Sequence, residues 1–190
     1  MRRSKVAAAE TRRRIVETAA AEFRRNGIRS TGLSDVMATA GLTHGGFYRH
    51  FASKDQLIAE ACTAAMQSPD AMAEAWARRA AGKKTLKVIL KSYLSTDHRD
   101  NVADGCPFAG LGSELARSDA KTRAAATSGF LKVVDVLARQ YRQANPEGAK
   151  ARALVAAAAM IGAVTMSRIV TDPKLSAALL RSAKQHLARI

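Results

Sequence analysis

The stretch LSDVMATAGLTHGGFYRHF, residues 33–51, has the pattern of two short helices joined by a tight turn. Gly41 stands between the two helices, where a residue without a side chain allows a steep crossing. Apolar residues recur on one side of both segments and form a seam: Val36, Ala40, Leu42, Phe47 and Phe51. This is the anatomy of a helix-turn-helix, with a plain core of packed helices as the alternative.

The second of these helices, from Thr43 to His50, carries hydroxyl, imidazole and guanidinium groups beside glycine on the face opposite the seam. These residues are Thr43, His44, Gly45, Tyr48, Arg49 and His50. Such groups hydrogen-bond phosphate oxygens and base edges, and glycine lets the backbone approach closely. The face therefore predicts a contact with double-stranded DNA.

A denser pattern surrounds this motif. From Thr31 to Leu57 it comprises Thr31, Asp35-Val36, Ala40-Gly41-Leu42-Thr43, Gly45, Phe47-Tyr48, His50-Phe51 and Ser53-Lys54-Asp55-Gln56-Leu57. These residues resemble the signature of the TetR family of one-component bacterial transcriptional regulators, and they match it without an insertion or deletion. The resemblance covers the first third of the chain and implies a repressor more often than an activator.

The resemblance also implies which residues touch DNA. They are Thr31 at the start of the second helix, Thr43, His44, Gly45 and Gly46 at the start of the recognition helix, Tyr48, His50, and Lys54 at the start of the fourth helix. Tyr48 and His50 suit phosphate oxygens, and Lys54 adds charge at an electropositive helix end. Gly46 departs from the family, which commonly has threonine, serine or alanine there. Base reading then falls on Thr43, His44 and Arg49.

Outside the motif, apolar residues repeat every three to four positions, which indicates an all-α chain of about nine helices. We expect helices at 10–26, 33–40, 43–50, 53–80, 84–97, 107–116, 120–143, 147–170 and 173–187. The breaks at Asn26-Gly27, Asn145-Pro146 and Asp172-Pro173 separate helices, and Ser53 to Gln56 reads as a capping box. The expected organisation is a DNA-binding domain at 1–54 and a larger helical effector-binding and dimerisation domain at 55–190.

The charge of the chain agrees with a polyanionic partner. Its 190 residues hold 31 Lys plus Arg against 16 Asp plus Glu, a net charge of +15. Residues 1–54 alone carry 11 basic and 4 acidic side chains. A positive field attracts nucleic acid, although it would also suit an acidic membrane surface.

Composition argues against several other classes. The longest apolar stretch, 153–166, is shorter than the roughly 20 residues that cross a bilayer, so no membrane span is expected. Two cysteines and no secretory signal indicate the cytoplasm. The four histidines are scattered, there is no CxxC, and no GxSxG or HExxH occurs. We therefore expect no metal, no cofactor and no enzymatic activity.

The second domain contains residues that suit an apolar effector pocket: Trp76, Tyr93, Cys106, Phe108, Leu111, Phe130 and Met160. Such residues equally form an ordinary bundle core. Pro107 fits the first position of a helix and places Cys106 at its N-cap, where the helix end favours a thiolate and the nearby Asp104 opposes it. Cys106 is either a buried structural thiol or a sensor.

The last two helices, 147–170 and 173–187, contain small residues that permit close helix contact, and the family uses its last two helices to dimerise. The prediction is a homodimeric repressor that binds a pseudo-palindromic operator and is released by a small apolar effector. Two alternatives stay open: a redox or electrophile sensor acting through Cys106, and an architectural DNA-binding protein without an effector.

Overall fold

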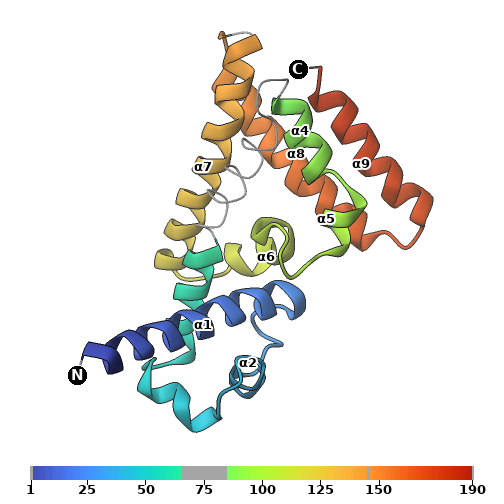
Figure 1. Ribbon diagram of the computed structural model, residues 1–190. Coiled ribbons are helices and arrows are strands. Elements are labelled where there is room, and N and C mark those ends of the chain that lie inside the picture. The colour runs from blue at the N-terminus through green and yellow to red at the C-terminus, as the bar shows by residue number, and fades with distance from the viewer. Residues whose placement is uncertain (1, 66–84, 145, 190) are drawn as a thin grey trace.

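The computed structural model describes residues 2–65, 85–144 and 146–189, which form helices and no strand. The elements are α1 (Arg2–Asn26), α2 (Leu33–Thr39), the 3-10 helix η1 (His44–Arg49), a helix over 54–65, α4 (Thr85–Tyr93), α5 (Thr96–Asp100), α6 (Pro107–Ala116), α7 (Ala120–Ala144), α8 (Ala149–Ile169) and α9 (Pro173–Leu187). In Figure 1, α1 and α2 lie at one end, and α7, α8, α4 and α9 form a bundle above them, with α6 between. The all-α architecture is confirmed.

Local signals placed several helix ends correctly. Helices α6 and α9 occupy the predicted ranges because a proline opens each one and the preceding residue is extended. At α9, the Asp172 carboxylate accepts a hydrogen bond of 2.8 Å from the backbone N–H of Lys174. Helix α1 ends at Asn26 because Gly27 takes a φ of +86°, which favours glycine.

Three predicted helices differ from the structure by more than one or two residues at an end or in the type of helix. Helix α1 begins at Arg2 and not at Glu10, since the alanines before Glu10 are strong helix formers. The helix expected over 84–97 is two helices, because the Ser95 hydroxyl caps α5 by accepting the N–H of His98 at 3.1 Å. The helix expected over 43–50 is the 3-10 helix η1, and two adjacent glycines each weaken an α-helix by about 1 kcal/mol.

The fourth helix begins with a modified capping box. The Ser53 hydroxyl accepts the N–H of Gln56 at 3.1 Å, as predicted. The Gln56 side chain reaches back to the N–H of Ala52, at 2.8 Å, one residue earlier than in a standard capping box. This helix is seen over 54–65, and the rest of the range predicted for it lies outside the described residues.

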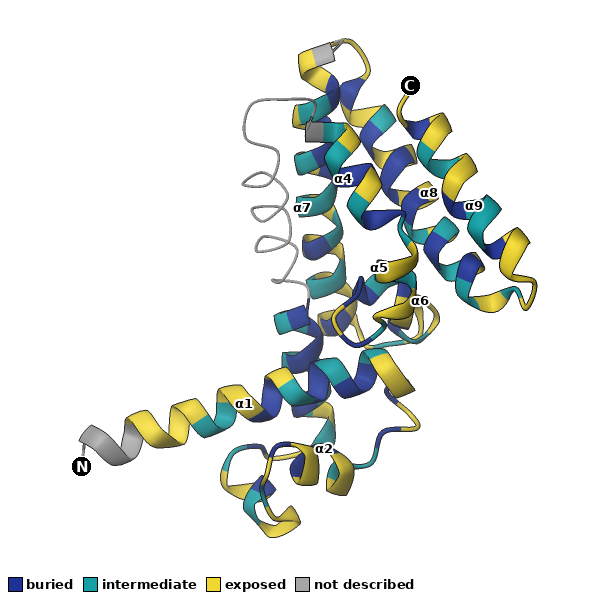
Figure 2. Ribbon diagram, turned by 45° about the vertical axis from the view of Figure 1, so that its right-hand side comes forward, coloured by how far each residue is buried: buried dark blue, intermediate teal, exposed yellow. Residues whose placement is uncertain are grey.

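Two apolar cores hold the chain together. The first contains Ile15, Phe23, Met37, Phe47, Phe51 and Leu57, and it also includes Leu111 and Leu115 of α6. The second is built from α4, α7, α8 and α9 around Leu90, Tyr93, Leu137, Met160 and Val164. Figure 2 shows that the buried residues of α1 lie in its C-terminal half, whereas residues 6–10 are exposed. Helix α6 therefore belongs to both cores.

Helix α8 lies at the centre of the bundle. Within the described residues it is the one helix long and apolar enough to cross a membrane, with a mean hydropathy of 1.4. It packs along α7 on one side and α9 on the other. Its apolar character is that of a helix with neighbours on two sides, and a further part of its surface stays exposed.

Candidate DNA interface and effector core

Helix η1 is anchored by one buried aromatic side chain. Phe47 is fully buried, stacks on Phe51 with ring centroids 5.4 Å apart, and meets the Tyr48 ring edge-on at 5.2 Å. Tyr48 itself is 66% exposed. Its neighbours Thr43, His44, Gly45 and Arg49 are also exposed, and Gly46 and His50 are half-buried. The polar side chains of η1 are thus exposed, and the buried Phe47 holds the helix that carries them.

His44 is oriented by contacts with two neighbours. Its Nδ1 lies 3.3 Å from the Ser34 hydroxyl of α2, and its ring meets that of Tyr48 edge-on with centroids 6.3 Å apart. With Nδ1 engaged, Nε2 is the ring nitrogen available for a base edge. A rigid side chain loses less conformational entropy on binding, which suits His44 to sequence reading.

Thr31 does not reach the surface as the resemblance implied. Its side chain is 2% exposed, and its hydroxyl donates to the Gly27 carbonyl at 2.7 Å. A hydroxyl that satisfies a helix C-terminus is not available to a phosphate. Lys54 is half-buried, and its Nζ donates to the Thr31 carbonyl at 2.7 Å. Both residues brace the segment between α1 and α2.

Arg12 of α1 ties η1 to its supports. Arg12 donates from Nε to the His50 carbonyl at 3.2 Å and from Nη2 to Glu60 at 2.6 Å, and its guanidinium lies 4.5 Å from the Phe51 ring centroid. The Arg12 hydrogen bond lowers the pKa of Glu60. Arg12 and Glu60 stand 48 positions apart, so no local pattern could have paired them.

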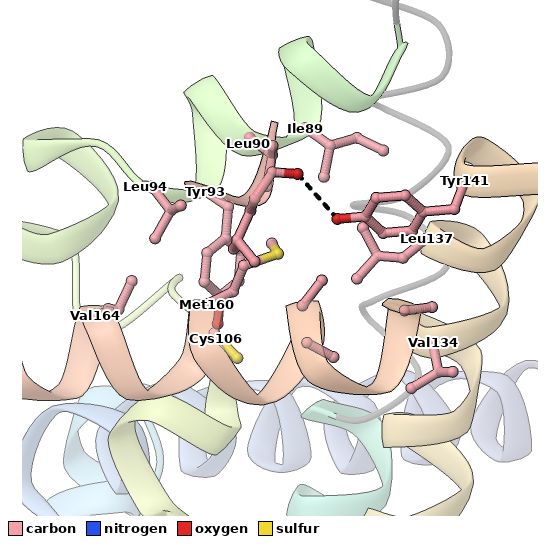
Figure 3. Packing of buried hydrophobic residues seen from close by; sticks show 14 of the residues in the cluster. Ile89, Leu90, Tyr93, Leu94, Cys106, Val134, Leu137, Tyr141, Met160 and Val164 are labelled. Carbon is pink, nitrogen blue, oxygen red and sulfur yellow. Dashed lines mark hydrogen bonds between the residues drawn. The ribbon is translucent and has the colours of Figure 1, made fainter. Parts of the chain in front are cut away.

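The residues predicted for the effector pocket do not all lie together. Tyr93, Cys106 and Met160 are buried side by side in the second core (Figure 3), and Phe108 and Phe130 pack edge-on at its margin with centroids 5.9 Å apart. Leu111 instead packs in the first core, against α1. Trp76 lies outside the described residues.

One cavity of about 870 Å³ lies between α1, the 54–65 helix and Asp104. Its lining mixes charged side chains, among them Arg12, Glu17, Arg24 and Glu60, with alanine and valine side chains. Of the residues predicted for the effector pocket, those that the structure describes do not line it. Among the described residues, its lining holds charged and small side chains and none of the aromatic or methionine side chains expected for the effector pocket.

Cys106 occupies the N-cap of α6 with Pro107 at the first helical position, as predicted. The thiol is only 4% exposed, and burial raises its pKa, in opposition to hydrogen bonds from Tyr93 and two backbone groups, which lower it. Burial likewise raises the pKa of Cys62 to about 11. Because the thiolate is the reactive form, both cysteines have the environment of structural thiols. This disfavours sensing through Cys106.

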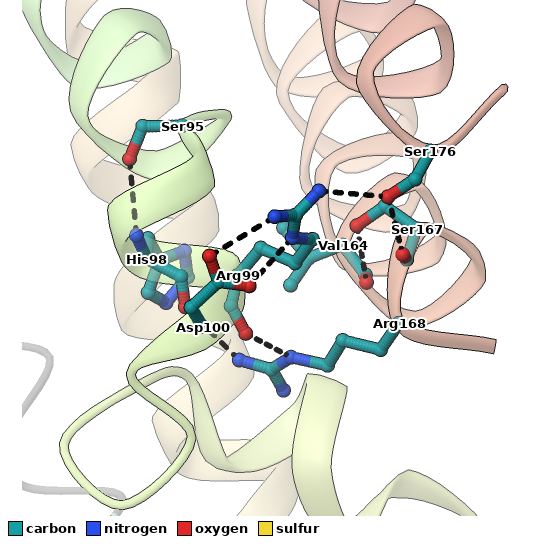
Figure 4. A network of polar contacts seen from close by, with 8 residues as sticks. All are labelled: Ser95, His98, Arg99, Asp100, Val164, Ser167, Arg168 and Ser176. Carbon is teal, nitrogen blue, oxygen red and sulfur yellow. Dashed lines mark hydrogen bonds and ion pairs between the residues drawn. The ribbon is translucent and has the colours of Figure 1, made fainter. Parts of the chain in front are cut away.

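A polar network joins α5 to the C-terminal end of α8 (Figure 4). Arg168 donates from Nε to the Arg99 carbonyl at 2.8 Å and from Nη2 to the His98 carbonyl at 3.1 Å, which satisfies the end of α5. Arg99 in turn donates to the Ser176 hydroxyl at 2.9 Å. The His98 ring bridges the Tyr93 carbonyl, 2.7 Å from Nδ1, and the Cys106 N–H, 3.0 Å from Nε2.

Comparison with known proteins gives the family of this chain. A model described as bacterial regulatory proteins, tetR family, matches residues 15–61, and a model for the C-terminal domain of LmrA/YxaF-like transcriptional regulators matches residues 83–185. The second match alone spans more than half of the 190 residues. The chain belongs to the TetR family. The resemblance carried by residues 31–57 is thereby confirmed.

Individual relatives agree with this membership. A TetR regulator from Chloroflexus aurantiacus is 30% identical over 100% of this chain and 96% of that chain, with a TM-score of 0.78. The probable acrEF/envCD operon repressor of Escherichia coli K12 is 41% identical over 59 residues, 31% of this chain and only 27% of that protein. AibR, solved with isovaleryl coenzyme A and operator DNA, has the same fold at 21% identity, with 93% and 97% coverage and a TM-score of 0.63.

His98 should make the stability of this TetR-family protein depend on pH. Burial lowers its pKa from the ordinary 6.5, and the nearby Arg168 lowers it further, against the bond to the Tyr93 carbonyl. The neutral ring is required, since Nε2 accepts the Cys106 N–H. As the pH falls, His98 is therefore protonated in the unfolded chain before it is protonated in the folded protein. The stability that neutral His98 contributes is complete above pH 6.5 and declines below it.

Urea unfolding between pH 5 and 8 measures this effect. We expect the free energy of unfolding of the parent to fall below pH 6.5. His98→Gln replaces the two ring nitrogens with an amide oxygen and an amide N–H but cannot titrate. Its free energy of unfolding should therefore change less with pH over this interval. Identical pH curves for the two proteins would contradict the role given to His98.

Proposed function

We propose that this protein is a repressor that binds a pseudo-palindromic operator as a homodimer and leaves it when a small effector binds the second domain. The observation that carries the proposal is the exposed polar face of η1, held by buried Phe47 in a chain that matches the TetR family in both halves. Two relatives support it by name: the E. coli protein is a probable operon repressor, and AibR was solved with operator DNA and isovaleryl coenzyme A.

The proposed roles follow from position and chemistry. Thr43, His44 and Arg49 read bases, Tyr48 and His50 bind phosphates, and Gly45 and Gly46 admit the DNA backbone closely. Lys54 contributes charge near the same surface while it supports the Thr31 carbonyl. A regulator of this kind acts where the chromosome is, in the cytoplasm, and needs no catalytic group.

Dimerisation is proposed through α8 and α9. Large apolar side chains are exposed along them: Leu154, Val155, Met166, Ile169 and Leu175. On α8, residues 155, 162, 166 and 169 share one face by helical spacing and are all exposed. An apolar stripe on two adjacent helices is the surface that pairs with its symmetry mate in a four-helix interface.

The effector is proposed to be small and largely apolar, and to enter the second core near Tyr93, Cys106, Phe108, Phe130 and Met160. This core is apolar and adjoins the N-terminal end of α6. An effector binding there stabilises one conformation over another, and coupling of this kind is typically worth 1 to 3 kcal/mol. Sensing by thiol modification is not favoured, because both cysteines are buried with raised pKa values. The effector-free architectural protein is not favoured either, because AibR, which has the same fold, was solved with both a small molecule and operator DNA.

Selection of bound DNA from a random pool tests the proposal, followed by affinity measurements on the selected operator. His44→Ala should cost about 1 to 3 kcal/mol and relax the preference at one base position. Tyr48→Phe should weaken binding to selected and random DNA alike and leave the base preference unchanged. Arg139→Ala, an exposed cation on α7, serves as the control. If His44→Ala weakens binding to random and selected DNA equally, His44 does not read bases.

A further inference from the structure

A carboxylate on α6 holds the turn that connects α1 to α2. Glu114 accepts the backbone N–H of Ile28 with Oε2 and the backbone N–H of Arg29 with Oε1, each at 3.1 Å. The partners are 86 and 85 positions apart in sequence. Both oxygens of one side chain are thus used on two successive backbone groups of the DNA-binding end.

The geometry of the turn is adapted to this carboxylate. Gly27 has a φ of +86°, and a Cβ atom placed there would lie 3.2 Å from the Glu114 Oε2 atom. The same turn supplies the Gly27 carbonyl that accepts the Thr31 hydroxyl, and the Thr31 carbonyl accepts Lys54. The position of α2 and of the 54–65 helix therefore depends on the backbone that Glu114 holds.

At its other end, α6 is fixed to the second core. The N–H of Cys106 at its N-cap donates to His98, and Thr165 of α8 donates to the Ala109 carbonyl at 3.3 Å. Between the two ends, a Cβ atom at Gly110 would lie 3.4 Å from the Arg24 carbonyl of α1, so the two backbones are close. A displacement of α6 relative to the second core would therefore also displace Glu114, which lies on the same helix.

We propose that Glu114 is the positioning residue through which the regulatory domain sets the helix-turn-helix. When α6 shifts, the carboxylate leaves the N–H groups of Ile28 and Arg29, the turn loses its support, and η1 loses its DNA-binding placement. Leu111 and Leu115 also join α6 to the first core, but apolar contacts tolerate sliding, whereas two hydrogen bonds to one carboxylate define a position. This inference rests on the proposed function.

The test uses Glu114→Gln and Glu114→Ala in the full chain, with Asp135→Asn as the control. Glutamine keeps the shape of glutamate but offers one acceptor oxygen in place of two. Asp135 is exposed on α7, so its substitution removes the same charge away from the turn. Hydrogen exchange should show the amides of Ile28 and Arg29 exchanging faster in Glu114→Ala, with Glu114→Gln intermediate and Asp135→Asn unchanged.

The decisive readout is reciprocal coupling to DNA. Because coupling between two sites acts in both directions, saturating operator DNA should slow exchange in α6 of the parent. In the Glu114 variants, operator affinity should fall about 5- to 150-fold, which is the typical range of coupling between two sites. Saturating operator DNA should then no longer slow hydrogen exchange in α6. If saturating DNA still slows hydrogen exchange in α6 of Glu114→Gln, Glu114 has only a structural role.

Failure of this inference and failure of the proposed function are distinguishable. If no operator emerges from the random pool for the parent protein, the proposed function is wrong and the coupling inferred for Glu114 falls with it, even where hydrogen exchange shows that Glu114 holds Ile28 and Arg29. If an operator is selected and bound, and the Glu114 variants behave like Asp135→Asn, the function stands and the inference fails.

Discussion

Replacing Val155 and Ile169 together with glutamate should convert the proposed dimer to a monomer and lower operator affinity about a hundredfold or more. These side chains are 62% and 63% exposed on one face of α8. In a symmetric interface each would meet apolar groups of the partner. A buried unpaired carboxylate typically costs about 3–5 kcal/mol, and four of them would be placed in the interface.

The loss of DNA affinity follows from the loss of pairing. Two linked half-sites increase overall affinity by about 10²- to 10⁴-fold over one, without any new contact. Sedimentation equilibrium gives the mass, and operator titration gives the affinity. Leu131→Glu is the matched control, because Leu131 is 44% exposed but lies on α7. A double variant that keeps the dimer mass would exclude this face as the interface.

Replacing Phe47 with alanine should lower the free energy of unfolding by about 3–5 kcal/mol and abolish operator binding. Phe47 is fully buried, and its ring lies between those of Phe51 and Tyr48. Its removal leaves a cavity under a 3-10 helix that contains two glycines and has little intrinsic stability. The exposed side chains of η1 would then lose their common support.

Urea unfolding and operator titration together test this expectation. Domains of this size usually have a free energy of unfolding of about 5–15 kcal/mol. A loss of about 3–5 kcal/mol therefore leaves the variant less stable than the parent but still folded over most of this range. Phe47→Leu serves as the control, since it keeps most of the volume and should cost much less. A Phe47→Ala protein that binds the operator as well as the parent would show that η1 is held by other contacts.

The parts of this molecule that the sequence predicts well are those specified by neighbouring residues. Prolines 107 and 173 fix the starts of α6 and α9, and Gly27 fixes the end of α1. The helix-turn-helix was recognised for the same reason, because its turn, seam and polar face all lie within residues 33–51. Short-range chemistry decides each of these features.

The features that the sequence did not predict depend on distant partners or on competition between neighbours. The bond between Arg12 and Glu60 and the bonds of Glu114 join residues far apart in the chain. Thr31 has the residue type of a DNA contact, but its burial and its hydrogen bond to the Gly27 carbonyl show that its hydroxyl is used inside the fold. The 3-10 form of η1 reflects its two adjacent glycines, which weaken an α-helix.

The dual membership of α6 in both cores bears on how such regulators can be recombined. Leu111 and Leu115 complete the apolar core around Phe23, and Glu114 completes the hydrogen bonding of the α1–α2 turn. A chimaera that joins residues 1–65 to a foreign sensor would leave this surface uncovered unless the sensor supplied equivalent side chains. The transferable DNA-reading unit is therefore discontinuous in sequence, and a graft must carry 107–116 along with the N-terminal segment.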